Sequence, residues 1–177
     1  MVIGCLYRLA CGGGELRRRG QNVDMSGRFA SMRAPSSARG WEGERGDRVR
    51  IVTDSASDIL PSHAQALGIS VVPNRITMDG RVLRDGVDLT ASQFYAWLPQ
   101  VKESLFSQPA SADDLYRAYY ADFQRGAAAV VAVHVSSRLS KVVEHAMVVR
   151  TYLGPAAPLF VIDSQQAGIG MWPAVIR

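Results

Sequence analysis

The segment Val130–Ser140, with the sequence VVAVHVSSRLS, constrains the fold more than any other part of the chain. It opens with Val130–Val135, a short apolar run typical of a buried parallel strand, and a helical pattern begins at about Leu139. Between them stand Ser136 and Ser137. Open α/β sheets bind ligands at the carboxyl ends of their strands, and hydroxyls beside the N–H groups of a following helix suit a carboxylate or a phosphate. The alternative is that Ser136 serves only as the N-cap of that helix.

Apolar runs and helical patterns alternate along most of the chain. Besides the run 130–135, the predicted strands are 49–53, 69–72 and 159–162. The predicted helices are 60–67, 91–101, 111–126, 139–152 and 167–176, the last interrupted by Pro173. Residues 75–77 and 82–83 are predicted to pair as a hairpin around Asp79–Gly80, and 104–110 to form a loop. This alternation predicts an α/β fold with a largely parallel sheet.

Three of the predicted strands end in a pair of polar residues that includes a serine. The pairs are Asp54–Ser55, Ser136–Ser137 and Asp163–Ser164. Because the carboxyl ends of parallel strands meet at one edge of a sheet, we expect these groups to converge on a single ligand.

Charge divides the chain into two parts. Residues 1–50 contain 10 Arg against 5 acidic residues, whereas residues 51–177 contain 10 Lys and Arg against 11 acidic residues. Residues 1–48 are rich in Gly, Arg and Ser without a hydrophobic period, so we predict a disordered extension followed by one domain over 49–177. Because that domain is nearly neutral, a nucleic-acid partner is not expected.

The two cysteines, Cys5 and Cys11, both lie in the extension. The domain therefore has no disulfide and no thiolate metal site, a pattern typical of the reducing cytoplasm. No apolar run approaches the roughly 18 residues that a transmembrane helix requires. We expect a cytoplasmic protein without a transmembrane segment.

Asp54 and the loop serines raise the alternative of a small hydrolase or phosphotransfer enzyme. A Ser–His–Asp triad would combine Ser137, either His134 or His145, and Asp54, and a phosphoryl site would use Asp54 and Asp58. However, no serine stands in a G-x-S-x-G motif. His134 alternates with valines in the predicted strand, which indicates a buried histidine, and the other two histidines are predicted on helix surfaces.

Other chemistry has little support in the sequence. The histidines are too scattered for a metal site, and the usual nucleotide-binding loops are missing, so we expect no metal and no cofactor. The acidic residues Asp113, Asp114 and Asp122 are predicted on a solvated helix face, and the aromatic residues Trp97, Tyr119 and Phe123 in the core.

Five blocks of the chain, in this order and spacing, resemble the DegV family. They are VRIVTDSASDILP, GISVVPNRITMDGRVLRDGVDL, SQP followed by a helix, VVAVHVSSRLS and LFVIDSQQAGIG. The resemblance covers the chain from about Val49 to its end. It implies a three-layer α/β fold, with a largely parallel sheet flanked by helices, that corresponds to the N-terminal domain of the family.

The resemblance also implies a function. DegV-family proteins bind a long-chain fatty acid and present it to a separate fatty-acid kinase, which phosphorylates the carboxylate. In the family, hydroxyls of a T-S-Q-P loop and an S-S-x-L-S-G-T loop hold that carboxylate. On the matching positions, the implied ligand-binding residues are Ser107, Ser136, Ser137 and Ser140, and the expected edge of the site is formed by Asp54, Ser55, Phe106, Lys141 and Ser164.

The sequence departs from the family pattern at three places. Phe106 stands where the family has a threonine, and losing one hydroxyl to a charged acceptor costs about 1.5–3 kcal/mol. Lys141 and Val142 replace Gly-Thr, although the Lys141 ammonium offers a cation in partial compensation. The chain also stops where the family continues into a second domain, so we expect exposed apolar surface and self-association.

Three hypotheses follow. The leading one is a fatty-acid-binding protein that holds a carboxylate at the strand ends and has no catalysis of its own. The alternatives are a hydrolase or phosphotransfer enzyme that uses Asp54 and a loop serine, and an inactive truncated remnant that folds but binds nothing.

Overall fold

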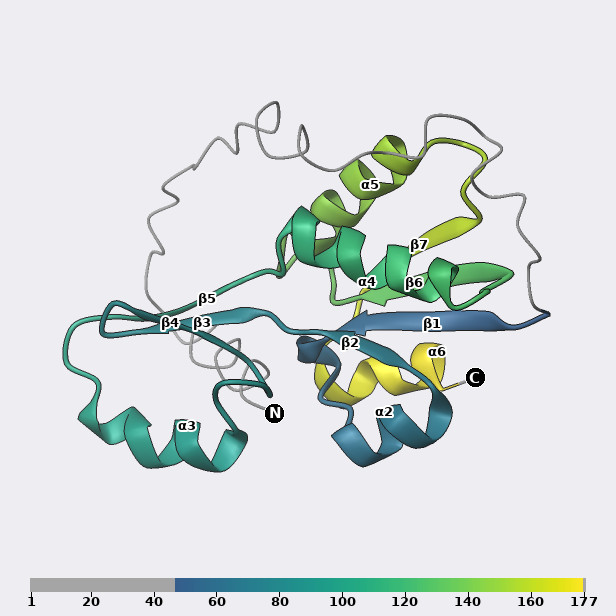
Figure 1. Ribbon diagram of the computed structural model, residues 1–177. Helices are drawn as coiled ribbons and strands as arrows, with labels where there is room; N and C mark the ends of the chain where they lie inside the picture. The colour runs from purple at the N-terminus through teal and green to yellow at the C-terminus, as the bar shows by residue number, and fades with distance from the viewer. Residues whose placement is uncertain (1–46, 177) are drawn as a thin grey trace.

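A four-stranded parallel sheet lies at the centre of the structure (Figure 1). The computed structural model describes residues 47–176, so the predicted disordered extension, residues 1–48, lies almost entirely outside the described residues. Across the sheet, the strands are β2 (Ser70–Val72), β1 (Val49–Asp54), β6 (Ala129–His134) and β7 (Leu159–Asp163). Every neighbouring pair is parallel, which confirms the predicted strands and their direction.

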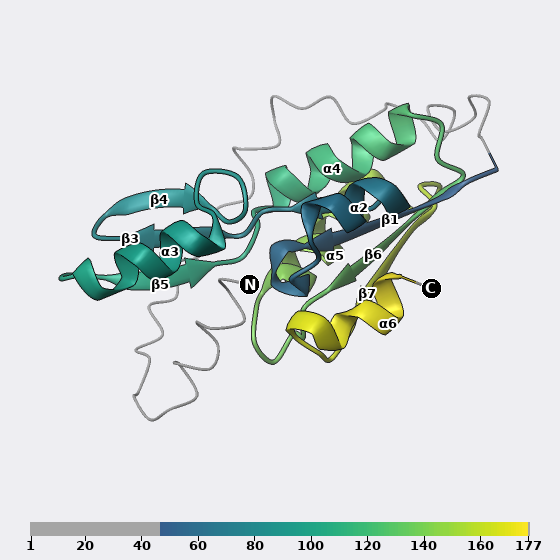
Figure 2. The same cartoon turned by 90° about the horizontal axis from the view of Figure 1, so that it is seen from below.

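Helices cover both faces of this sheet and give the three layers expected. The helices α4 (Ala112–Gln124) and α5 (Val142–Leu153) pack together on one face, and α2 (Pro61–Leu67) and α6 (Trp172–Val175) lie on the other (Figures 1 and 2). Short 3-10 turns, Ser55–Ser57 and Gly168–Met171, complete the second face. The α/β fold class is therefore confirmed.

The core lies mainly between the sheet and helices α4 and α5. Val52 of β1 and Val130 of β6 are fully buried, as are Leu115 and Tyr119 of α4. In β6 the last three residues are all buried, because layers cover the strand on both faces. A continuous apolar run is what such a strand requires.

A second sheet extends from one end of the first. It is antiparallel, with the order β4 (Arg81–Arg84), β3 (Arg75–Met78) and β5 (Leu105–Gln108), and α3 (Ala91–Trp97) covers one side of it (Figure 2). The hairpin between β3 and β4 confirms the prediction. Its two turn residues, Asp79 and Gly80, have φ values of 48° and 79°, as a type I′ turn requires.

Three predicted boundaries were wrong. Residues 104–110 are not simply a loop, because Leu105–Gln108 pairs with β3 as a strand without an apolar run of its own. The helix expected from Leu139 begins instead at Val142, after a turn. Pro173 does not interrupt a helix but stands in the first turn of α6, where proline fits because its missing N–H would have no helical partner.

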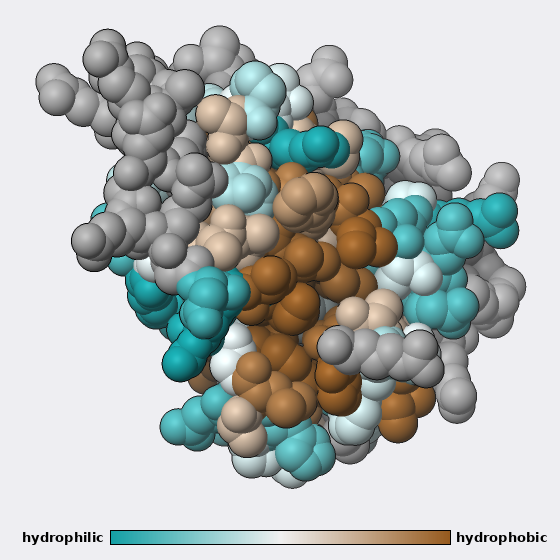
Figure 3. All heavy atoms as spheres, turned by 90° about the vertical axis from the view of Figure 1, so that its right-hand side faces the viewer, coloured by the Kyte–Doolittle hydropathy of each residue, from teal (hydrophilic) through white to brown (hydrophobic). Residues whose placement is uncertain are grey.

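The surface of the described residues is not uniformly polar. Apolar side chains gather in a broad area on the side that lies to the right in Figure 1 (Figure 3). On the edge strand β7, Phe160 and Ile162 expose 55% and 43% of their surface. None of the helices in residues 47–176 is long and apolar enough to cross a membrane.

Candidate carboxylate site at the strand ends

The carboxyl ends of β1, β6 and β7 lie side by side on one edge of the parallel sheet. Ser55 follows β1, Ser164 follows β7, and the turn after β6 contains Ser136, Ser137 and Ser140. We call residues 136–141 the serine turn. The topology of the sheet therefore brings these five serines to one edge.

Asp54, at the end of β1, is buried beneath this edge and holds its segments together through hydrogen bonds. Its side chain is completely buried and accepts four hydrogen bonds. Oδ1 accepts from the N–H of Ala56 at 2.9 Å and from Asn74 Nδ2 at 3.1 Å. Oδ2 accepts from His134 Nδ1 at 3.0 Å and from the N–H of Val135 at 3.1 Å. Burial opposes ionisation of this carboxyl, but these donors, above all His134, hold its pKa below the usual value.

His134 extends this buried hydrogen-bond network toward α4. Its Nε2 lies 2.7 Å from the hydroxyl oxygen of Tyr119, and both side chains are fully buried. Burial and the charge of Asp54 raise the pKa of Tyr119, so its hydroxyl keeps its proton in this contact. Because the Asp54 carboxylate only accepts hydrogen bonds, Nδ1 of His134 is the donor in that contact. His134 is therefore a buried, satisfied residue, as its place in the strand predicted.

Asn74 connects this hydrogen-bond network to the second sheet. Its own N–H donates to Ser55 Oγ at 3.1 Å, and its Oδ1 accepts from the N–H of Ala110 at 2.8 Å. The carbonyl of Ala110 lies 2.8 Å from Nδ1 of His145, in the first part of α5. The segment that follows β5 is thereby fixed both to the end of β1 and to the helix after the serine turn. His145 is half-buried in this contact, so the prediction of a simple surface residue was wrong.

The hydroxyls of Ser136 and Ser140 shape the serine turn and keep their protons available. Ser136 is 4% exposed, and its Oγ accepts from the N–H of Arg138 at 3.3 Å. Ser140 Oγ accepts from the N–H of Val142, the first residue of α5. Ser136 is thus not the N-cap of the helix, and that alternative was wrong. Neither hydroxyl donates to an acceptor within residues 47–176, so both can donate to a ligand.

Ser137 already holds a carboxylate. Its Oγ donates to Oδ2 of Asp163 at 2.6 Å, and its N–H donates to Oδ1 at 3.2 Å. The N–H of Gln165 donates to the same Oδ1 at 2.9 Å. Although burial opposes it, these bonds and the charge of Arg138 lower the pKa of Asp163. The serine turn therefore offers the donors that a carboxylate needs, and in this structure Asp163 uses those of Ser137.

Ser107 and Phe106 lie in β5, where neighbouring side chains point to opposite faces. Ser107 is paired with the fully buried Ile76, and Phe106 with Thr77 on the other face, where Phe106 is 42% exposed. Within the described residues, no hydrogen bond joins the Ser107 hydroxyl to the serine turn. The two positions of the motif therefore face different surroundings.

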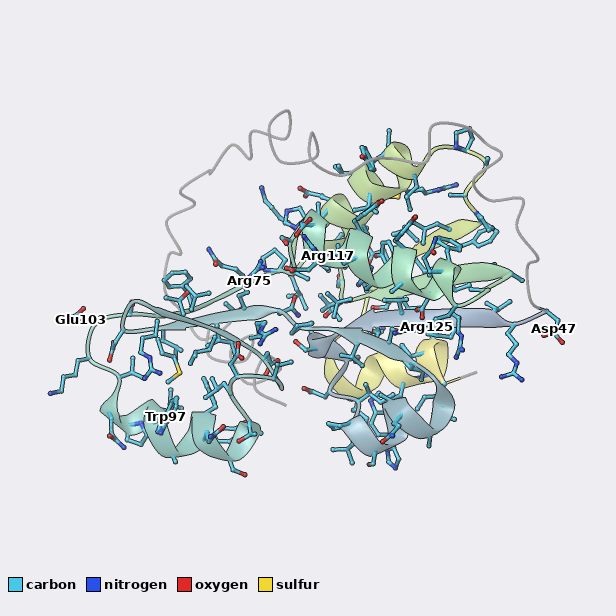
Figure 4. The ribbon with its side chains drawn as sticks, in the orientation of Figure 1. Asp47, Arg75, Trp97, Glu103, Arg117 and Arg125 are labelled. Carbon is cyan, nitrogen blue, oxygen red and sulfur yellow. The ribbon has the colours of Figure 1, made fainter. Side chains whose placement is uncertain are left out.

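Cations near this edge are few. Lys141 and Arg138 are exposed in the serine turn. Arg75 lies where β3 approaches α4 (Figure 4), but its guanidinium is 2.7 Å from the carboxylate of Asp114. Arg75 is therefore already paired, and a ligand carboxylate would depend on hydroxyl donors more than on ion pairs.

The geometry does not assemble the alternative catalytic groups. Both nitrogens of His134 are occupied, and the Ser137 hydroxyl donates to Asp163 instead of to a histidine. Both carboxylate oxygens of the buried Asp54 accept hydrogen bonds from protein groups, so the carboxyl is not presented to a substrate.

The structure also identifies residues that the sequence interpretation missed or misplaced. Asn74 follows β2 as a single polar residue and gave no signal of its own. Asp163 stood within a recognised strand-end pair, but its partner Ser137 could not be deduced from spacing. Asp122, predicted on a solvated face, is buried and accepts from Ser70 Oγ at 2.9 Å and from Arg125 at 3.0 Å.

Comparison with known proteins decides the family. A family model described as "Uncharacterised protein, DegV family" matches residues 48–177. The chain belongs to the DegV family. A DegV domain-containing protein of Deinococcus radiodurans is 32% identical over 130 residues, which are 73% of this chain and 45% of that protein. This DegV-family chain thus spans less than half the length of that relative.

Solved DegV structures share the fold. A DegV family protein from Thermus thermophilus, described for its fatty acid binding, is 27% identical with a TM-score of 0.66, over 73% of this chain and 45% of that one. A stearic acid-binding protein from Eubacterium ventriosum is 25% identical with a TM-score of 0.61, over 68% of this chain and 43% of that one. The DegV fold of residues 47–176 is therefore that of part of these longer proteins.

Proposed function

We propose that this DegV-family chain takes part in binding a long-chain fatty acid, with the carboxylate held at the serine turn. The Thermus and Eubacterium relatives named for fatty-acid and stearic-acid binding support the ligand class. The proposal assigns the carboxylate to Ser136, Ser137 and Ser140, with Ser107 on β5 of the second sheet. No catalytic step is assigned to the chain itself.

The contact between Ser137 and Asp163 carries this proposal. A carboxylate accepts hydrogen bonds and needs convergent donors to leave water. The turn supplies such donors to Asp163 at 2.6 and 3.2 Å. The protons of Ser136 and Ser140 are two more donors on the same turn. A ligand carboxylate would use these two and compete with Asp163 for the third.

We further propose that the bound carboxylate is presented to a fatty-acid kinase. Ser137, Arg138 and Leu139 are exposed, so the serine turn is open to a second protein. Arg138 and Lys141 would attract the carboxylate without enclosing it. Formation of an acyl phosphate from ATP by a purified fatty-acid kinase, with and without this chain, tests the partner separately from the ligand.

Displacement of a fluorescent fatty acid by unlabelled stearate tests the ligand site. We expect Ser136→Ala and Ser140→Ala each to weaken binding about 10-fold or more, because each removes a donor to a charged acceptor. Ser62→Ala, an exposed serine of α2, is the matched control and should leave affinity unchanged. Equal affinity in all three variants would contradict the assignment.

Phe106 favours one competing function, that of a domain that folds but no longer binds lipid. Its ring lies on the exposed face of β5 where the family pattern has a hydroxyl. If the ligand reaches that face, Phe106→Thr should tighten stearate binding about 10-fold. If neither the wild type nor Phe106→Thr binds, the non-binding function is the better account.

A further inference from the structure

A pocket of about 640 Å³ lies between α2 and the connection from β4 to α3, and its described lining residues include Ser55, at the end of β1, but none from the serine turn. Most of its wall is apolar and includes Ile59, Leu60, Ala64, Ile69, Val71 and Val87. Leu60, Val71 and Val87 remain substantially exposed although they are large apolar side chains. This volume would hold a small organic molecule with an aliphatic part.

The charged groups of the pocket all have the same sign. Asp58 and Asp85 line it, and no lysine, arginine or histidine is among its described lining residues. Asp85 is 6% exposed and accepts a hydrogen bond from the hydroxyl of Ser55. Burial raises the pKa of Asp85, and the nearby Asp54 raises it further, while the hydrogen bond from Ser55 lowers it.

We propose that this pocket binds a small organic amine, with its ammonium against Asp85 and its aliphatic chain along the apolar wall. An ammonium would supply a positive charge and further hydrogen-bond donors to the buried acid. A fatty-acid carboxylate would face two like charges here and is disfavoured. The pocket is therefore a second site with the opposite charge preference to the serine turn, and it does not depend on the fatty-acid proposal.

Calorimetric titration with octylammonium and with octanol separates charge recognition from apolar burial. The two probes have the same chain length and differ in the head group. We expect saturable octylammonium binding with one site per chain and at least 10-fold weaker binding of octanol. Absence of saturable octylammonium binding, or equal affinity for both probes, would overturn the proposal.

Variants locate the site. Asp85→Asn should weaken octylammonium binding at least 10-fold, and Val87→Trp, at an exposed lining position, should block it by filling the pocket. Asp113→Asn, on α4 and paired with Arg117, is the matched control and should bind normally. Circular dichroism confirms that each variant is folded. Normal binding by Val87→Trp would show that the amine binds elsewhere and would overturn the assignment.

Discussion

His134 Nδ1 lies 3.0 Å from Asp54 Oδ2, and this buried contact joins the ends of two neighbouring parallel strands. The same carboxylate oxygen accepts the N–H of Val135, immediately before the serine turn. The position of the turn relative to β1 therefore depends on a charged group that is never exposed to solvent. The proposed carboxylate site thus lies beside a buried carboxylate whose charge is satisfied by its own donors.

Replacing Asp54 should destabilise the whole domain. Asp54→Asn keeps the shape but places an amide against four donors, so buried N–H groups lose their acceptor. We expect a loss of roughly 3 kcal/mol in the free energy of unfolding. Urea denaturation measures it, and Asp113→Asn should change stability by less than about 0.5 kcal/mol. Equal stability of the two variants would contradict the role of Asp54.

The contact between Tyr119 and His134 should contribute less. Tyr119→Phe removes only the hydroxyl and leaves Nε2 of the buried imidazole without its hydrogen-bond partner. We expect a loss of about 1–3 kcal/mol with the fold retained. The same denaturation experiment measures it. A variant as stable as the wild type would show that the hydroxyl is dispensable.

The loss of folding stability at acidic pH should depend on Asp54. Its pKa is lower in the folded protein than the usual 3.8, because the bonds from His134 and the backbone outweigh the effect of burial. A group of this kind stabilises the fold above its unfolded pKa, and the contribution is lost as pH falls below that value. The stability gap between wild type and Asp54→Asn should therefore narrow between pH 5 and pH 3. A constant gap over this range would count against the charge of Asp54.

Asp163 should limit the affinity of the serine turn for a carboxylate. Asp163→Asn removes a negative charge beside Ser137, so a fatty acid no longer meets a like charge there. We expect stearate to bind several-fold more tightly, with a smaller change at high salt. The fluorescent displacement assay measures the effect. Weaker binding in this variant would mean that Asp163 supports the ligand site and does not compete with it.

The exposed side chains of β7 should cause self-association. Phe160 and Ile162 are two residues apart on an edge strand, so they lie on one face of the sheet. Sedimentation velocity should show a mass that rises with concentration, and Phe160→Ser should reduce it. Val82→Ser, equally exposed on the second sheet, is the control. A wild type that is monomeric at every concentration would refute this proposal.

The parallel sheet was predictable because its strands are short apolar runs, three of which end in polar pairs. The hairpin at Asp79–Gly80 was predictable because few dipeptides adopt two positive φ values. β5 was not predictable, since Leu105–Gln108 has no pattern of its own and is defined by its pairing with β3.

The site was less predictable than the fold. Hydroxyl residues at the strand ends indicated where a ligand could bind, but side-chain partners depend on the three-dimensional arrangement. Ser137 and Asp163 are 26 residues apart, and Asp54 and His134 are 80 residues apart. The buried Asp122 likewise accepts a hydrogen bond from Ser70 of β2, which no helical pattern in its own segment could reveal.

Mass spectrometry of lipid released from the purified, denatured protein tests the central claim most directly. The account predicts one fatty acid in a near-stoichiometric amount from the wild type, and a much smaller amount from a variant that combines Ser136→Ala with Ser140→Ala. Absence of fatty acid from the wild type, or equal amounts from both proteins, would contradict binding at the serine turn.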